Sequence, residues 1–323
     1  MKHVRIAALL TLMTILVTGC MQNGSQEDWT PADDVPEIPR KLEKAESAGG
    51  LPSLTVYDTT DEKLSEMDIE TYVMGVVAGE MKNDWPLEAL KAQAILARTF
   101  TLKFCEDGTS KYSGADISTD VTEAQAYAAR DINDKVRQAV GETRGMAMVY
   151  DGRFPHAWFH AHAGGMTELP TVSLDYEKDD PEYLKPVKSE ESEKAPESVK
   201  AWTATFTRDQ VAKACADAGL KVKSVERVEL GEKGKSGRAK TLLINGETVS
   251  AASFRIHIGA NKLKSTLIED ISLDDDRVTF SGRGFGHGVG MSQWGAYGMA
   301  EKGRSAEEII RHYFNGVSIV KFW

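Results

Sequence analysis

The chain has 323 residues, of which 41% are hydrophobic and 27% are charged, so it is long and apolar enough to bury a core and is not a disordered protein. Its formal net charge is −10 and it has no long block of lysine and arginine, which excludes a general electrostatic attraction to nucleic acid. The three cysteines are too few to define a disulfide scaffold.

The first twenty residues have the pattern of a processing signal. Lys2 and Arg5 precede the apolar run IAALLTLMTILV, which is too short to span a bilayer comfortably, and VTGC follows. VTGC resembles a bacterial lipobox, which implies a signal peptide over 1–19, a diacylglycerol on Cys20 and a lipid anchor on the outer face of the cytoplasmic membrane. An ordinary secreted protein or an uncleaved anchor is the alternative. In each case we expect the chain to act outside the cytoplasm.

The next segment has the composition of a tether. Residues 21–50 are rich in proline, glycine and acidic residues and show no apolar periodicity, so we expect a flexible tether over 20–50 that begins at the lipidated Cys20. The remainder, 51–323, is predicted to form one domain. Its two cysteines, Cys105 and Cys215, lie too far apart in sequence for a metal-ligand spacing, and they are either buried thiols or a disulfide.

Two helices are predicted near the start of this domain, after a short strand at 54–58. Asp68 can cap the first helix, and Pro86 stands where the second one, over 87–104, begins. Glu80 falls at the end of the first helix and faces the turn. Glu80 is one acidic residue among many, and periodicity alone does not select it.

Helices and strands alternate irregularly through the rest of the chain. The expected elements are a helix over 123–140, strands around an Asp151–Gly152 turn, an exposed loop over 175–200, a helix opened by Thr207 or Asp209, and strands near 222–230, 239–244 and 248–250. A capping box of Ser305 and Glu308 predicts a last helix through Phe314, followed by an Asn315–Gly316 turn and a strand. Because there is no regular βαβ rhythm, we predict an α+β fold in which mostly antiparallel strands and helices form one catalytic domain with a substrate groove.

A glycine-rich segment, SGRGFGHGVGMSQWGAYGMA at 281–300, places glycine at alternate positions from 282 to 290 around His287. Neither a dinucleotide fingerprint nor a phosphate-binding loop fits it. One interpretation is a groove of bare backbone in which His287 projects and Trp294 stacks on a sugar ring. The other is a tightly packed bulge that buries the histidine and the tryptophan.

The segment HAWFHAH suggests a metal site because His156, His160 and His162 are close in sequence and neutral imidazole binds zinc. Neither helical nor strand spacing completes a known three-ligand signature. We therefore expect structural or substrate-contacting histidines, and we predict no metal and no cofactor.

Several segments, taken together, resemble the SpoIID/LytB family. They are YVMGVVAGEM, LEALKAQAILARTF, FHAHAGGMTE, the SGR of 236–238, FRIHIGANKLKST and GRGFGHGVGMSQWGAYGMAEKG, in this order from about residue 54 to the C-terminus. The resemblance implies a lytic transglycosylase that cleaves MurNAc–GlcNAc bonds of peptidoglycan to 1,6-anhydro-MurNAc ends, preferring strands whose stem peptides an amidase has removed. It implies Glu80 as the catalytic acid, and as groove residues Lys91, Gln93, Arg98, His160, His287, Gln293 and Trp294.

A lytic transglycosylase needs only one catalytic carboxyl group, whereas a glycan hydrolase usually needs two. That carboxyl must start protonated, so the pKa of Glu80 is expected to lie well above about 4.3. Neighbours such as Ala78 and Trp85 can raise it by desolvation, and a nearby Lys91 or Arg98 would oppose the shift.

The chain also departs from the family pattern. It has Ala161, His162 and Ala163 where members often carry serines, and it lacks the cysteines with which some members bind zinc. The lipobox is a further departure from the family pattern, because the protein after which the family is named is usually held by a transmembrane helix. A sporulation-linked role, germination and general wall remodelling therefore stay open. The competing hypotheses are a noncatalytic peptidoglycan-binding enhancer of a cell-wall amidase and a histidine metalloenzyme.

Overall fold

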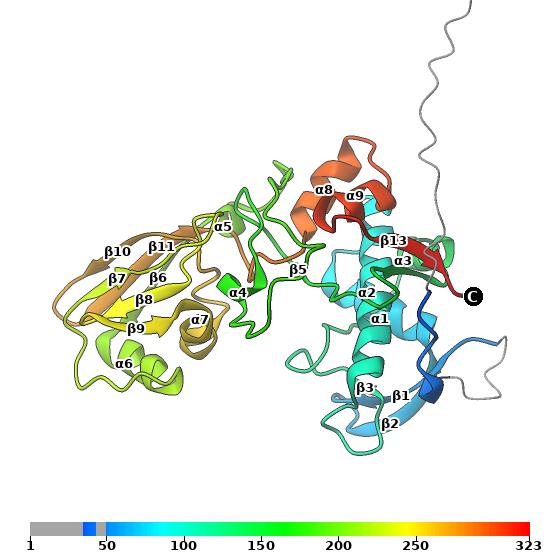
Figure 1. Ribbon diagram of the computed structural model, residues 1–323, viewed down its shortest axis with the longest axis horizontal. Coiled ribbons are helices and arrows are strands. Elements are labelled where there is room, and N and C mark those ends of the chain that lie inside the picture. Colours follow the sequence, from blue (N-terminus) through cyan, green and yellow to red (C-terminus); the bar gives the residue numbers. More distant parts are fainter. Residues whose placement is uncertain (1–34, 43–49) are drawn as a thin grey trace, which may run out of the picture.

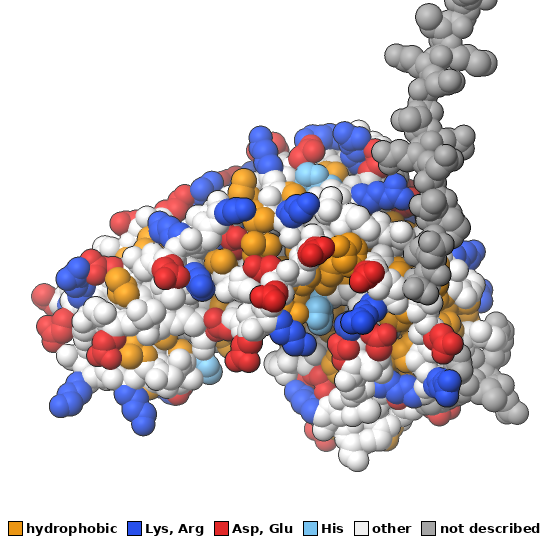
Figure 2. All heavy atoms as spheres, viewed as in Figure 1, with side chains coloured by type: hydrophobic (Ala, Val, Ile, Leu, Met, Phe, Trp, Pro, Cys, Tyr) orange, Lys and Arg blue, Asp and Glu red, His pale blue; other side chains and the backbone are white. Residues whose placement is uncertain are grey.

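The computed structural model describes residues 35–42 and 50–323, and its helices and small, mostly antiparallel sheets form an α+β fold, as predicted. The predicted signal peptide over 1–19, Cys20 and much of the predicted tether lie outside the described residues. Within 35–42 and 50–323, no helix is both long enough and apolar enough to cross a membrane. Figure 1 shows two parts, one built around α1 and α2 and the other around β6 to β11, and Figure 2 shows a notch between them.

The first part is built around the long helix α2 (Leu87–Asp107), most of whose residues are buried. It packs against α1 (Ile69–Glu80), which begins where the Asp68 carboxylate accepts the N–H of Thr71 at 2.9 Å, so the predicted cap is confirmed. Strand β1 (Ser53–Asp58) pairs antiparallel with β2 (Lys63–Asp68) and parallel with β3 (Ile117–Ser118).

The C-terminal residues return to this same core. Strand β13 (Ser318–Lys321) pairs antiparallel with β4 (Met146–Val149), and β12 (Met291–Ser292) pairs parallel with β5 (Phe159–His160). The other elements of this part are η1 (Arg40–Leu42), η2 (Ala129–Asp131), α3 (Asp134–Glu142), α4 (Pro170–Ser173), α8 (Gln293–Glu301) and α9 (Ala306–Tyr313), the last with the predicted capping box. One hydrophobic core therefore joins both ends of the described chain.

The second part has a hydrophobic core of its own. Its sheet has the order β10-β11-β6, and alternation in β6 turns Trp202, Ala204 and Phe206 inward while the threonines between them are exposed. The predicted domain over 51–323 thus contains two hydrophobic cores. The bounds are α5 (Glu197–Lys200), which leads in, then β6 (Ala201–Thr207), α6 (Arg208–Asp217), β7 (Val228–Leu230), β8 (Thr241–Ile244), β9 (Glu247–Ser250), α7 (Ala251–Gly259), β10 (Ile268–Leu273) and β11 (Arg277–Arg283).

The helix predicted over 123–140 is wrong in its first half, since α3 begins only after its cap Asn133. The preceding residues run along α1, and a Cβ at Gly79 would lie 2.7 Å from the backbone of Ala126. Close packing on α1 thus replaces helix in this segment. The prediction of an exposed loop over 175–200 is also wrong in part, because Tyr183 and Leu184 are buried in the first core.

Two further expectations need correction. The turn at Asp151–Gly152 exists, but β4 takes its strand partner from the C-terminus, and the turn itself closes only a single bridge between Tyr150 and Arg153. Residues 35–42, inside the predicted tether, lie on the domain and bury Leu42 completely.

The two cysteines of the domain are not paired with each other. Both are buried, Cys105 in the first core and Cys215 in the second, so the alternative of a disulfide between them is excluded.

The alternating glycines are explained by packing against other segments of the same chain. Gly284, Gly286, Gly288 and Gly290 have φ angles between 70° and 105°, a region that favours glycine. A Cβ at Gly288 would lie 2.4 Å from the guanidinium of Arg238, and one at Gly290 would lie 1.9 Å from the carbonyl oxygen of Trp158. The packed interpretation of this segment is therefore confirmed for its backbone.

Gly290→Ala is expected to lower the free energy of unfolding by about 3–5 kcal/mol, because it combines a positive φ with a backbone clash. Gly303→Ala is the matched control: φ is +82° and no atom lies within 4 Å of the new Cβ, so only about 1–2 kcal/mol should be lost. Urea denaturation measures both. Equal losses would contradict the packing explanation.

Candidate active site

Glu80 ends α1 with a partly buried carboxyl group that two distant segments hold. Its Oε1 accepts the backbone N–H of Ala126 at 2.7 Å, and its Oε2 accepts the Nε2 of Gln293 at 3.4 Å. Burial raises the pKa of Glu80 above its ordinary value, and these two hydrogen bonds offset the rise only in part. The protonated form thus persists to higher pH than in an exposed glutamate.

Two glutamines link α2 and α8 beside this carboxyl. Gln293 is the first residue of α8, and its Nε2 also lies 3.5 Å from the Oε1 of Gln93. Gln93 is fully buried, and its Nε2 has no hydrogen-bond partner in the described chain. A buried donor without a partner is costly, so this amide is a group that the packing leaves unsatisfied.

Trp294 positions α8 instead of facing solvent. It is 8% exposed, and its ring lies 4.4 Å from that of Trp85 and 5.2 Å from that of Tyr297. Trp85 belongs to the segment that joins α1 to α2. The cluster therefore fixes α8 near the end of α1, and the indole of Trp294 packs against aromatic rings of the protein and not against a sugar ring.

His160 and His287 lie next to each other, with ring centroids 5.6 Å apart. The Nδ1 of His160 lies 3.1 Å from the carbonyl oxygen of Val289, and the Nδ1 of His287 accepts the N–H of the same residue at 3.0 Å. Burial lowers the pKa of His287 to about 3 and holds that of His160 well below its usual range. Both rings are therefore neutral near pH 7.

The histidines do not form a cluster of metal ligands. Among the described residues, no three histidine, cysteine, aspartate or glutamate side chains are grouped so as to hold a metal ion. The Nε2 of His160 is buried and has no hydrogen-bond partner among the described residues, so it is a second polar atom that the packing leaves unsatisfied. His162 is mostly buried, and burial lowers its pKa to about 4.

Lys91 and Arg98 are not brought to Glu80. The Lys91 amine pairs with Glu88 at 2.8 Å and Glu142 at 2.5 Å. Arg98 is fully buried and pairs with Glu70 at 2.6 Å. The pKa of Glu80 is consequently set by burial and two hydrogen bonds and not by these cations.

A buried network that sequence reasoning missed supports the start of α8. Glu191 accepts the N–H of Ala163 at 2.8 Å and the hydroxyl of Ser292 at 3.1 Å, and Ser292 caps α8 by accepting the N–H of Gly295. Arg238, fully buried, donates to the carbonyl of Ala163 at 2.7 Å. The SGR motif signalled Arg238, whereas nothing in the sequence singled out Glu191.

Two family models match the chain. A family model described as Stage II sporulation protein, SpoIID, matches residues 57–150, and one described as a domain of unknown function, DUF8618, matches residues 161–290. An uncharacterised protein of Brachyspira hyodysenteriae is 33% identical over 267 residues, which cover 82% of this chain and 70% of that protein.

Two relatives from Bacillus subtilis have functional names. Stage II sporulation protein D is 31% identical over 281 residues, covering 83% of this chain and 78% of its own length. A protein named Amidase enhancer is 27% identical over 292 residues, covering 77% of this chain and 40% of its own length. The chain belongs to the SpoIID family, that of the stage II sporulation protein D.

Glu80→Gln is expected to stabilise the protein at pH 7 by about 0.5–2 kcal/mol, because it removes a charge that burial penalises. A carboxyl with a raised pKa contributes stability below its unfolded pKa and loses it as pH rises through the folded value. The gap between variant and wild type should therefore shrink at pH 4. Thermal denaturation at both pH values measures it, with the exposed Glu307→Gln as control; a gap that stays constant would contradict the account.

Proposed function

We propose that the protein is a peptidoglycan lytic transglycosylase that acts outside the cytoplasm and uses Glu80 first as general acid and then as general base. The observation that carries the proposal is the Glu80 carboxyl itself: partly buried, raised in pKa, and contacted by Gln293 and Ala126. Membership of the SpoIID family supports a role on the cell wall.

The reaction needs two proton transfers at one carboxyl group. Protonated Glu80 gives its proton to the oxygen between MurNAc and GlcNAc, and the bond from that oxygen to the anomeric carbon of MurNAc breaks. The carboxylate then takes the proton of the MurNAc 6-hydroxyl, whose oxygen bonds to the anomeric carbon. The products are a 1,6-anhydro-MurNAc end and a free GlcNAc hydroxyl, and Glu80 ends protonated as it began.

The surroundings of Glu80 suit both halves of this cycle. Burial favours the protonated acid that the first transfer needs. The Gln293 amide and the Ala126 N–H stabilise the carboxylate that exists between the two transfers, and they hold its two oxygens in fixed directions. Gln93 Nε2 and His160 Nε2, both buried and without partners in the described chain, would bind the sugars only after these side chains become exposed.

The wider setting is part of the same proposal. We expect strands freed of stem peptides as substrate, an amidase as the partner that prepares them, and a lipid anchor at Cys20 on the outer face of the membrane. The family name favours a sporulation-linked role over general wall remodelling.

The second candidate is a noncatalytic peptidoglycan-binding enhancer of a cell-wall amidase. The relative named Amidase enhancer favours it. In that case the protein would bind glycan without cleaving it, and Glu80 would be a binding residue or a structural one.

Mass spectrometry of peptide-free glycan strands separates the two candidates. Wild-type protein should produce 1,6-anhydro-MurNAc ends, and Glu80→Gln should reduce the rate by about 10²- to 10⁴-fold, the range for losing one general acid. Glu307→Gln, which removes an exposed carboxylate on α9, should keep the full rate. Failure of all three proteins to cleave the strands, with binding intact, would favour the enhancer.

A further inference from the structure

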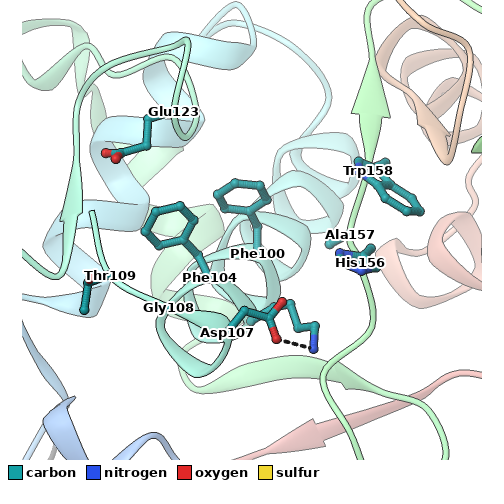
Figure 3. A pocket seen from close by; sticks show the side chains of 10 residues that line it. Phe100, Phe104, Asp107, Gly108, Thr109, Glu123, His156, Ala157 and Trp158 are labelled. Carbon is teal, nitrogen blue, oxygen red and sulfur yellow. Dashed lines mark hydrogen bonds and ion pairs between the residues drawn. The ribbon is translucent and has the colours of Figure 1, made fainter. Parts of the chain in front are cut away.

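A pocket of about 350 Å³ lies between the C-terminal half of α2 and the segment before β5. Phe100 and Phe104 of α2 line one side, and His156 and Trp158 line the other (Figure 3). None of these residues contacts Glu80, and the reaction above does not use them.

The aromatic rings of this pocket form two platforms. The rings of Phe100 and Phe104 are 6.1 Å apart and inclined by 21°, and those of His156 and Trp158 are 4.6 Å apart and inclined by 15°. Because the rings of each pair are stacked, their outer faces are the ones that suit the apolar C–H faces of a sugar ring. Polar groups stand at the edge, where Lys103 pairs with Asp107 at 2.9 Å, so the pocket has the mixed lining of a small-molecule site.

One wall leads from this pocket to Glu80 through 123–126. Glu123 lines the pocket, and three residues further on the backbone N–H of Ala126 binds the Glu80 carboxyl. The opposite wall, residues 156–160, also leads from the pocket toward Glu80. His156 and Trp158 line the pocket, while His160 pairs with Ser292, the residue before Gln293.

Helix α2 sets the distance between Glu80 and the pocket, but its residues from Ala92 to Thr99 are fully buried and form no open floor. Gln93, Phe100 and Phe104 are separated by seven and four residues, which places them on the same side of the helix. At about 1.5 Å per residue, the two phenylalanines lie about 10 to 17 Å along the axis from Gln93. The pocket and Glu80 are therefore the two ends of one strip that is bounded by the segments 123–126 and 156–160.

We propose that this aromatic pocket is a remote sugar-binding subsite, which holds a pyranose ring of the same glycan strand that is cleaved at Glu80. The inference rests on the proposed function. Because the spacing along α2 exceeds one ring, only an oligosaccharide long enough to reach both ends fills the strip. The protein should consequently bind long strands more tightly than short ones.

The test measures binding as a function of strand length in the full chain carrying Glu80→Gln. By calorimetry, a peptide-free octasaccharide of peptidoglycan should bind about tenfold more tightly than the tetrasaccharide. Adding Phe104→Leu keeps an apolar side chain but removes the ring, and should abolish this tenfold gain while tetrasaccharide binding is unchanged. Phe104→Tyr keeps the ring and should keep the gain.

Ile256→Ala, an exposed apolar truncation on α7 in the second part, is the matched control and should also keep the gain. A length gain that survives Phe104→Leu, equal binding of the two oligosaccharides, or binding of neither, would overturn the subsite. Failure of the transglycosylase proposal would give a different result. Wild-type protein would leave the strands uncut, while the octasaccharide would still bind more tightly than the tetrasaccharide and Phe104→Leu would still abolish that difference.

Discussion

The site depends on the contact between Glu80 and Gln293, which are separated by 213 positions in the sequence. It brings the end of α1 to the start of α8, and Ala126 completes it with a backbone N–H. The three groups come from distant parts of the chain, so this carboxyl has its buried environment only when both ends of the first core are assembled. Because burial is the main cause of its raised pKa, the chemistry that we assign to Glu80 depends on that assembly.

The glycine-rich segment and the SGR motif make this contact possible. Gly288 leaves room for the buried guanidinium of Arg238, which binds the loop after β5 through the carbonyl oxygen of Ala163. That loop and Glu191 hold Ser292, which caps α8 and thereby fixes the direction of Gln293. The glycine-rich segment, the SGR motif and the loop after β5 therefore act together to position Gln293. The glycines contribute by letting these segments pack closely on one another.

Elements with local signals could be predicted from the sequence. Asp68 and the Ser305–Glu308 pair define helix starts within four residues of themselves, and both caps are present. Long-range packing could not be predicted in this way. Gly79 admits the backbone of Ala126 beside α1, and this contact replaces the helix expected before Asn133.

In the candidate site, too, local sequence signals predict little and long-range packing decides the outcome. Only the family resemblance points to Glu80, because one acidic residue at a helix end has no pattern of its own. The resemblance implies Arg98 as a groove residue, yet its partner Glu70 lies 28 positions away and the pair is buried in the core. Which motif residues line a groove and which pack inside is decided by partners that no local pattern specifies.

The central claim is that burial keeps the Glu80 carboxyl ready to donate a proton, and an NMR titration of the side-chain carboxyl carbons in the full chain tests it most directly. The account predicts a midpoint for Glu80 above the ordinary value of 4.5, and a still higher midpoint in Gln293→Leu, which removes a hydrogen bond that lowers the pKa. A midpoint at or below 4.5 in the wild type would contradict the account.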